Sequence, residues 1–205
     1  MVRSLAPFDK TVSGLNEQIA FLVESDKLNT VLRRNYTVAA DRRENSAEHS
    51  WHVALTAVLL AEYSNQPVNI DRVVRMLLVH DLVEIDAGDT FIYDSVANTS
   101  KEAREREAAK RLFGLLPESQ ASELHELWDE FETRATPEAK FAGAVDRFVA
   151  VLHNYATHGR GWKENGISRS RVLEVNQRVA EGSETLWAKI QEMTQEAVKR
   201  GDLME

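Results

Sequence analysis

The sequence predicts an all-α protein, a single-domain bundle of helices. Only nine glycines and four prolines are spread over its 205 residues, and β-sandwiches and barrels need turns more often than that. Apolar residues recur at helical spacing in several segments, and no stretch sustains the alternation of a strand. Because no repeat, low-complexity tract or Pro/Ser-rich linker interrupts the chain, we expect one domain over residues 1–205.

Apolar spacing and capping signals place the helices along the chain. They are expected at residues 11–25, 46–63 with Ser46 as N-cap, 71–84, 99–114, after Pro117, and 136–157, followed by a last helical region at about 167–199. Loops are expected at residues 26–47, 88–98 and 158–166. Pro137 supports the sixth helix because proline suits the first helical position. The charged run Lys101–Arg111 is expected to form a solvated helix face with i, i+4 ion pairs.

The composition excludes several kinds of protein. Without cysteine, the chain cannot form disulfides, a thiolate nucleophile or a sulfur-ligated zinc site. No apolar run reaches the ~18 residues of a membrane span, and the N-terminus lacks a signal-peptide core. The formal net charge of −8 argues against nucleic acid polymers, which need a basic face. A metal and a few local cations can still attract a small anion. We expect a cytoplasmic protein that binds neither membranes nor nucleic acid polymers.

Three polar residues interrupt the most apolar segment of the chain. Residues 73–85 leave almost no polar face, so this helix is expected to be buried. His80, Asp81 and Glu84 lie inside it, and a buried carboxylate is costly unless it is paired or bound to a metal. His80 and Glu84 are i, i+4 and share a face, with Asp81 on the neighbouring stripe. A divalent cation is the natural common partner of the three.

Two more apolar helices contain the same anomaly. His49 begins one of them, and Asp146 interrupts the apolar run of the other. With His80 and Asp81, two histidines and two aspartates thus come from three buried helices. Such nitrogen and oxygen ligands suit Mn, Fe, Co, Ni or Zn better than Ca, which prefers all-oxygen shells. His52, three positions after His49, is expected to pack or hydrogen-bond nearby instead of binding the metal.

These residues and their flanking sequences resemble the HD superfamily of metal-dependent phosphohydrolases, and in particular its 5′-deoxynucleotidase-like branch. The matching stretches are residues 42–50, 78–89, 102–108, 115–117, 126–132 and 139–141 ahead of Asp146. The resemblance covers about residues 28–146. It implies an HD-type helical bundle whose metal-site core spans about residues 28–157, and a homodimer. It also implies one divalent metal ion (Mn, Co, Fe, Ni, Zn or Mg), held by His49, His80, Asp81 and Asp146.

The resemblance further implies an activity, the release of phosphate from nucleoside (deoxy) 5′-monophosphates. Glu84 would activate or orient the attacking water, and Asp89 would contact the sugar or help to protonate the leaving oxygen. An arginine ahead of the first ligand helix would hold the phosphate. Arg33 and Arg34 both fit that position, and we prefer Arg33. Some relatives carry a tryptophan just after this arginine, whereas Asn35 follows the pair here, so the nucleotide selectivity is not carried over.

Two other hypotheses stay open. One is another HD chemistry, namely phosphodiester or pyrophosphate hydrolysis or a two-metal oxygenase, but no further HD pair or regular histidine spacing supplies ligands for a second metal. The other is a non-catalytic nucleotide-binding or helical interaction module, for which Glu84 and Asp89 are unnecessary. The chain has neither a GxxxxGK[ST] loop nor a GxSxG elbow, which excludes a P-loop ATPase and a serine hydrolase of that type.

Overall fold

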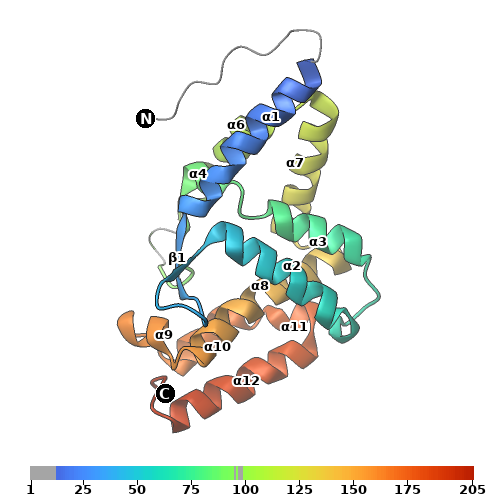
Figure 1. The fold of residues 1–205 in the computed structure, drawn as a ribbon. Coiled ribbons are helices and arrows are strands. Elements are labelled where there is room, and N and C mark those ends of the chain that lie inside the picture. Colours follow the sequence, from blue (N-terminus) through green and yellow to red (C-terminus); the bar gives the residue numbers. More distant parts are fainter. Residues whose placement is uncertain (1–12, 95, 97–98) are drawn as a thin grey trace.

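The computed structural model describes residues 13–94, 96 and 99–205, and its regular structure is almost entirely helical (Figure 1). In chain order the elements, with short 3-10 helices written η, are α1 (Ser13–Ser25), η2 (Asp26–Thr30), β1 (Leu32–Tyr36), β2 (Arg43–Asn45), α2 (Ser46–Leu60), η3 (Ala61–Tyr63), α3 (Ile70–Val79), α4 (Glu84–Ala87), α6 (Lys101–Phe113), α7 (Glu118–Thr133), α8 (Pro137–Ala156), α9 (Arg160–Glu164), α10 (Arg169–Asn176), α11 (Val179–Gly182) and α12 (Glu184–Lys199). The all-α prediction is confirmed. Residues 11, 12, 95, 97 and 98 of the predicted elements lie outside the described residues.

Helix α8 is the central element of the fold. It contacts α2, α3 and α7 on one side and α11 and α12 on the other. In Figure 1, α1, α6 and α7 form one end of the molecule and α9 to α12 form the other, with α2, α3 and α8 between them. The expected helix at residues 136–157 is confirmed as α8: Thr136 caps it by accepting a hydrogen bond from Ala139 N, and Pro137 is its first residue.

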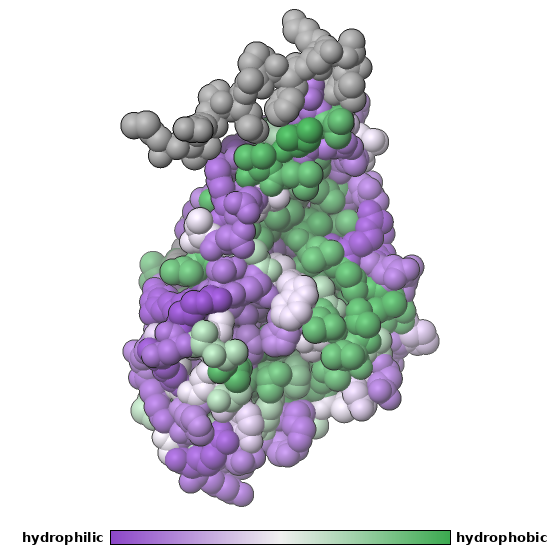
Figure 2. All heavy atoms as spheres, in the orientation of Figure 1, coloured by the Kyte–Doolittle hydropathy of each residue, from purple (hydrophilic) through white to green (hydrophobic). Residues whose placement is uncertain are grey.

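One surface of the molecule is apolar. Figure 2 shows hydrophobic side chains gathered over α1, α2 and α3 on the side turned to the viewer. Among the large apolar side chains that these three helices expose, by 41% to 66%, are Leu15 and Leu22 of α1, Leu55, Val58 and Leu59 of α2, and Leu78 of α3. We call these six residues the apolar face. Within the described part of the chain, none of the helices combines the length and the apolarity that crossing a bilayer requires.

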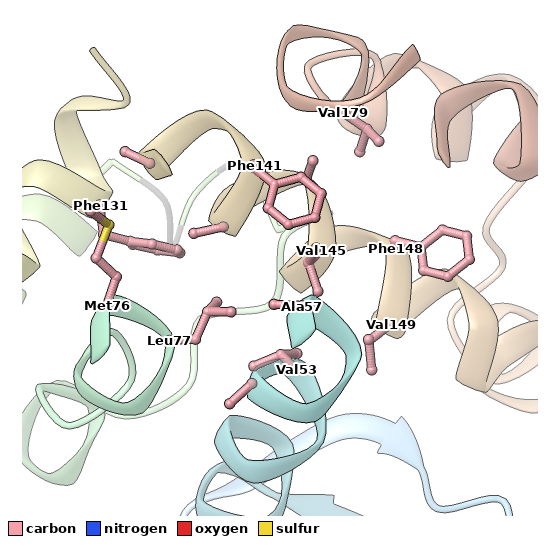
Figure 3. Packing of buried hydrophobic residues seen from close by; sticks show 14 of the residues in the cluster. Val53, Ala57, Met76, Leu77, Phe131, Phe141, Val145, Phe148, Val149 and Val179 are labelled. Atoms are coloured by element: carbon pink, nitrogen blue, oxygen red, sulfur yellow. The ribbon is translucent and has the colours of Figure 1, made fainter. Parts of the chain in front are cut away.

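The hydrophobic core lies where α2, α3 and α8 meet. Figure 3 shows Val53 of α2 and Leu77 of α3 pointing toward Val145 of α8, and Phe141 of α8 close to Val179 of α11. All five side chains are fully buried. Because α8 is apolar on several sides, it fixes the positions of the helices around it, and it carries Asp146 into their midst.

The polar segment expected to be a loop is instead partly ordered. β1 and β2 pair as an antiparallel hairpin, with Leu32 opposite Asn45 and Tyr36 opposite Arg43. The prediction missed it because strands this short and this polar show no sustained alternation. The hairpin leads directly into α2, whose N-cap is Asn45 and not the expected Ser46. Asn45 and Glu48 form a capping box, in which each side chain accepts a hydrogen bond from the other's backbone N–H.

The prediction of one continuous helix at residues 71–84 is also wrong. α3 ends at Val79 and α4 begins at Glu84. Between them the backbone winds through i→i+3 hydrogen bonds, such as the one from Glu84 N to Asp81 O at 3.0 Å. His80 and Asp81 therefore lie in a tight turn at the end of α3, and the α-helical spacing assumed for them does not apply there. Likewise α9 lies in the expected loop at residues 158–166.

Candidate metal centre

The four expected metal ligands converge at one point between α2, α8 and the turn after α3. His49, His80 and Asp81 are buried, and each offers a ligand atom within 4.8 Å of those of the other two. Asp146 joins them from α8, with its Oδ1 at 3.0 Å from His49 Nε2 and 3.9 Å from His80 Nε2. Two imidazole nitrogens and two carboxylates at this spacing are a donor set for a divalent transition metal.

The ring of His80 is oriented by the backbone of its own turn. Its Nδ1 lies 2.7 Å from Leu77 O, and since a carbonyl only accepts, Nδ1 carries the proton and donates it. Nε2 is left with a lone pair, is buried, and has no hydrogen-bond partner among the described residues. It lies 3.1 Å from Asp81 Oδ1. An orphaned nitrogen aimed at carboxylate oxygens fits a site built for a cation.

His49 and Asp146 form a close charge pair, with His49 Nε2 at 3.0 Å from Asp146 Oδ1. Burial and the Arg33 guanidinium oppose protonation of His49, but the carboxylates of Asp146 and Glu44 raise its pKa to about 9. Burial likewise opposes ionisation of Asp146, yet the hydrogen bond from His49 and the charges around it hold the pKa of Asp146 well below its usual range. In the metal-free site a proton on His49 thus occupies the position that a cation would take.

The structure separates the two arginines that the sequence left in competition. Arg33 points into the site, where its Nη1 donates to Asp81 Oδ2 at 2.7 Å and lies 3.9 Å from Glu84 Oε1 and 3.7 Å from Asp89 Oδ1. Arg34 is exposed, with its guanidinium carbon 5.8 Å from the centre of a phenylalanine ring. They diverge because neighbouring residues of a strand point to opposite faces.

Glu84 and Asp89 stand beside the candidate ligands without joining the closest cluster. Glu84 Oε2 accepts a hydrogen bond from Ser46 Oγ at 2.6 Å. Burial and the neighbouring charge of Asp81 raise the pKa of Glu84, and burial also raises that of Asp89 against the opposing charge of Arg33. Both carboxyl groups are therefore easier to protonate than ordinary surface acids, as groups that exchange protons with a substrate must be.

The site opens into a cleft with two different halves. The half around the turn after α3 is charged, and Lys101, Glu105, Arg134 and Arg147 line it together with the candidate ligands. The other half is lined by aromatic rings and amides, namely Asn35, Phe91, Tyr93, Asn154, Trp162 and Asn176, with Arg34 and Arg147 beside them. Arg33, Asp89 and Asp146 border both halves. Trp162 of α9 and Asn176 of α10 come from the helices that follow α8, so these helices form part of the cleft wall.

Sequence reasoning missed two acidic residues here. Glu44 is fully buried with its Oε2 at 3.3 Å from His49 Nδ1. Its only signal was its place in the stretch that resembles the HD superfamily. Glu105 belongs to the run expected to be a solvated face; its pair with Lys101 at 3.5 Å is present, but Glu105 itself is buried and burial raises its pKa to about 7. Five residues of α6 are buried, and Glu105 is one of them.

Comparisons with known proteins agree with this geometry. The sequence matches the HD-domain family over residues 25–187. It is 34% identical over 140 residues to human 5′-deoxynucleotidase HDDC2, covering 68% of this chain and 67% of the relative. It is 29% identical to the fission yeast 5′-deoxynucleotidase hdd1, covering 71% and 76%. A crystal structure from Magnetospirillum magnetotacticum, described as a predicted metal-dependent phosphohydrolase, superposes with a TM-score of 0.91 at 50% identity over 97% of this chain and 100% of that one. The chain therefore belongs to the HD-domain family of metal-dependent phosphohydrolases.

Proposed function

We propose that the protein is a 5′-deoxynucleotidase, which releases phosphate from deoxynucleoside 5′-monophosphates with one divalent cation held by His49, His80, Asp81 and Asp146. The observation that carries this proposal is the unpartnered, buried Nε2 of His80, which meets the other ligand atoms at the charged end of a two-part cleft. The names of the human and yeast relatives support the substrate class.

The shape of the cleft suits a nucleoside monophosphate. A phosphate needs cations, and the charged half offers Arg33 and the residues that would hold the metal ion. A nucleoside needs a partly apolar surface and a few polar groups, and the other half offers Phe91, Tyr93 and Trp162 with amide side chains between them. Asp89 stands at the border between the halves, where the sugar of such a substrate would lie.

Each residue around the ligands has a distinct task in phosphate transfer to water. When bound, the cation supplies Lewis acidity and lowers the pKa of a coordinated water. Arg33, within 4 Å of four carboxylates, is placed to hold phosphate oxygens that enter between them. Glu84, with its raised pKa and its hydrogen bond from Ser46, is placed to take the proton of the attacking water. Asp89, whose pKa is also raised, is placed to bind the sugar or return a proton to the leaving oxygen.

Metal removal tests this proposal. The purified protein should lose phosphate release from dAMP after treatment with a chelator and recover it when Mn²⁺ or Co²⁺ is added back. His80→Ala should not recover, because the site loses one ligand nitrogen, whereas His158→Asn should, because the side chain of His158 is 80% exposed and pairs with Asp202 away from the ligands. Full turnover in the chelated protein would reject the metal-dependent mechanism.

We also propose that the protein is a homodimer joined through its apolar face. Six large apolar side chains from three helices make a patch that monomeric proteins rarely leave in water. A second copy would cover it with an identical apolar surface. Light scattering should give a dimer, and Leu59→Glu should give a monomer, while Met204→Glu, at an equally accessible position elsewhere, should leave the dimer intact. A monomeric native protein would contradict this.

We place the enzyme in the cytoplasm, because a chain without cysteine has no need of an oxidising compartment.

A further inference from the structure

A carboxylate and two further histidines form a chain that runs from His49 toward the surface. Glu44 of β2 lies between two imidazole rings: its Oε2 is 3.3 Å from His49 Nδ1, and its Oε1 is 3.4 Å from His153 Nδ1. The opposite nitrogen of His153, Nε2, is hydrogen-bonded at 3.0 Å to Nδ1 of His52. Glu44 and His153 are buried, whereas His52 is partly exposed.

The groups that face each ring nitrogen in this row of side chains decide which nitrogen carries a proton. An ionised carboxylate only accepts hydrogen bonds, so both Nδ1 atoms that face Glu44 carry a proton. Neither Nδ1 atom makes a hydrogen bond within the described part of the molecule, and neither does Glu44 Oε2, so at 3.3 and 3.4 Å the two imidazoles contact the carboxylate just outside hydrogen-bond geometry. Burial lowers the pKa of His153, so this ring is neutral and its Nε2 accepts from His52. For His49, a proton on Nδ1 makes Nε2 the nitrogen that can bind the metal, once the proton that it donates to Asp146 has left.

The geometry favours hydrogen bonds over a second cation among Glu44, His52 and His153. The rings of His52 and His153 have centroids 5.0 Å apart and planes inclined by 27°, so with 3.0 Å between the facing nitrogens they meet edge to edge. A tetrahedral zinc ion holds two imidazole nitrogens about 3.3 Å apart, because each metal–nitrogen bond is about 2.0–2.1 Å long, and the two nitrogens here are closer than that. One ligand atom of each of the three groups lies within 4.8 Å of the others, but His153 presents one nitrogen to Glu44 and the opposite one to His52.

We propose that Glu44, His153 and His52 form a positioning chain that fixes the tautomer and the ring orientation of His49, and through it sets the affinity of the metal centre. This inference rests on the proposed function only in that it takes His49 as a metal ligand. A carboxylate that accepts the second N–H of a metal-bound histidine raises the basicity of the ligand, and its loss typically costs about 10–100-fold in metal affinity. His153 contributes to the metal affinity indirectly: it contacts the other oxygen of Glu44 and so helps to orient the carboxylate that faces His49.

Zinc affinity, measured without substrate by competition with a chelating dye, tests the proposal. Glu44→Gln should bind Zn²⁺ about 10–100-fold more weakly, because an amide has one oxygen and cannot accept both Nδ1–H groups. His153→Leu should bind roughly 2–10-fold more weakly, since one polar contact of Glu44 is lost. His153→Asn should bind like the native protein, because its amide N–H stands close to the place of Nδ1. His158→Asn is the control of the same residue type outside the chain.

Nitrogen-15 NMR of the imidazole rings in the zinc-loaded protein provides a second readout. The native protein should show Nδ1–H on both His49 and His153, and Glu44→Gln should switch one of the two rings to the other tautomer. Native zinc affinity in Glu44→Gln, or an equal loss in His153→Asn and His153→Leu, would overturn the proposal. So would a second bound Zn²⁺ that disappears in His52→Leu. Because no substrate enters these measurements, they separate this inference from the proposed nucleotidase activity.

Discussion

Lowering the pH from 9 to 7 should weaken metal binding about 50-fold, because a proton and the metal compete for Nε2 of His49. Although burial and the Arg33 guanidinium oppose protonation, the carboxylates of Asp146 and Glu44 raise the pKa of this histidine from the usual 6.5 to about 9. Each pH unit below about 9 then costs a factor of ten in affinity, or about 1.4 kcal/mol. At pH 7.5 most metal-free molecules carry this proton, so binding of one metal ion should release about one proton.

Calorimetric titration with Co²⁺ between pH 6.5 and 9, in buffers of different ionisation enthalpy, measures both the affinity and the released protons. The same raised pKa also stabilises the metal-free fold: its contribution of about 3 kcal/mol is complete below pH ~6.5 and is lost as the pH rises through about 9. Metal-free protein should therefore unfold more easily at pH 9.5 than at pH 6.5. A metal affinity that stays constant between pH 8.5 and pH 7 would refute the assignment of His49 as the protonated ligand.

Four substitutions test other parts of the account. His80→Ala or Asp81→Ala should remove bound metal and activity together, as measured by metal analysis and phosphate release; a variant that keeps both would remove the residue from the ligand set. Glu84→Gln should keep the metal and lower turnover by roughly 10²–10⁴-fold, whereas loss of the metal would make Glu84 a ligand. Gly182→Ala should cost about 1–3 kcal/mol in the free energy of unfolding, because a Cβ there would lie 2.2 Å from Lys140 O and push α11 away from α8; unchanged denaturant unfolding would show that the helices adjust freely.

The helices and the candidate ligands were predictable because their signals are local. Apolar runs with helical spacing identified α2, α3 and α8, and a histidine or an aspartate inside each run was anomalous on its own. His49, His80, Asp81 and Asp146 could thus be named without knowing how the helices pack. The same local rule misplaced the turn after α3, because buried residues in 3-10 winding show the same apolar pattern as those of an α-helix.

Features that depend on tertiary contacts could not be predicted. The hairpin strands are only five and three residues long, and their pairing decides that Arg33, and not Arg34, reaches the carboxylates of the candidate metal site. Glu44 reaches His153 only because β2 and α8 meet across about a hundred residues of sequence. His52 was expected to hydrogen-bond nearby, and its bond to His153 confirms this, but the partner was not foreseeable. Trp162 and Asn176 reach the cleft through packing of the C-terminal helices against α8.

Phosphate release from dAMP, AMP, dATP and a short oligodeoxynucleotide, with Mn²⁺ or Co²⁺ present, tests the central claim most directly. One arginine and the metal can meet the single phosphate of a monophosphate, whereas the chain has no Gly-rich loop for the β and γ groups of a triphosphate and no basic track for a strand. We expect phosphate from the monophosphates, with dAMP hydrolysed at least as fast as AMP, and little from the other two compounds. Cleavage of dATP or of the oligonucleotide as fast as both monophosphates would contradict the nucleotidase assignment.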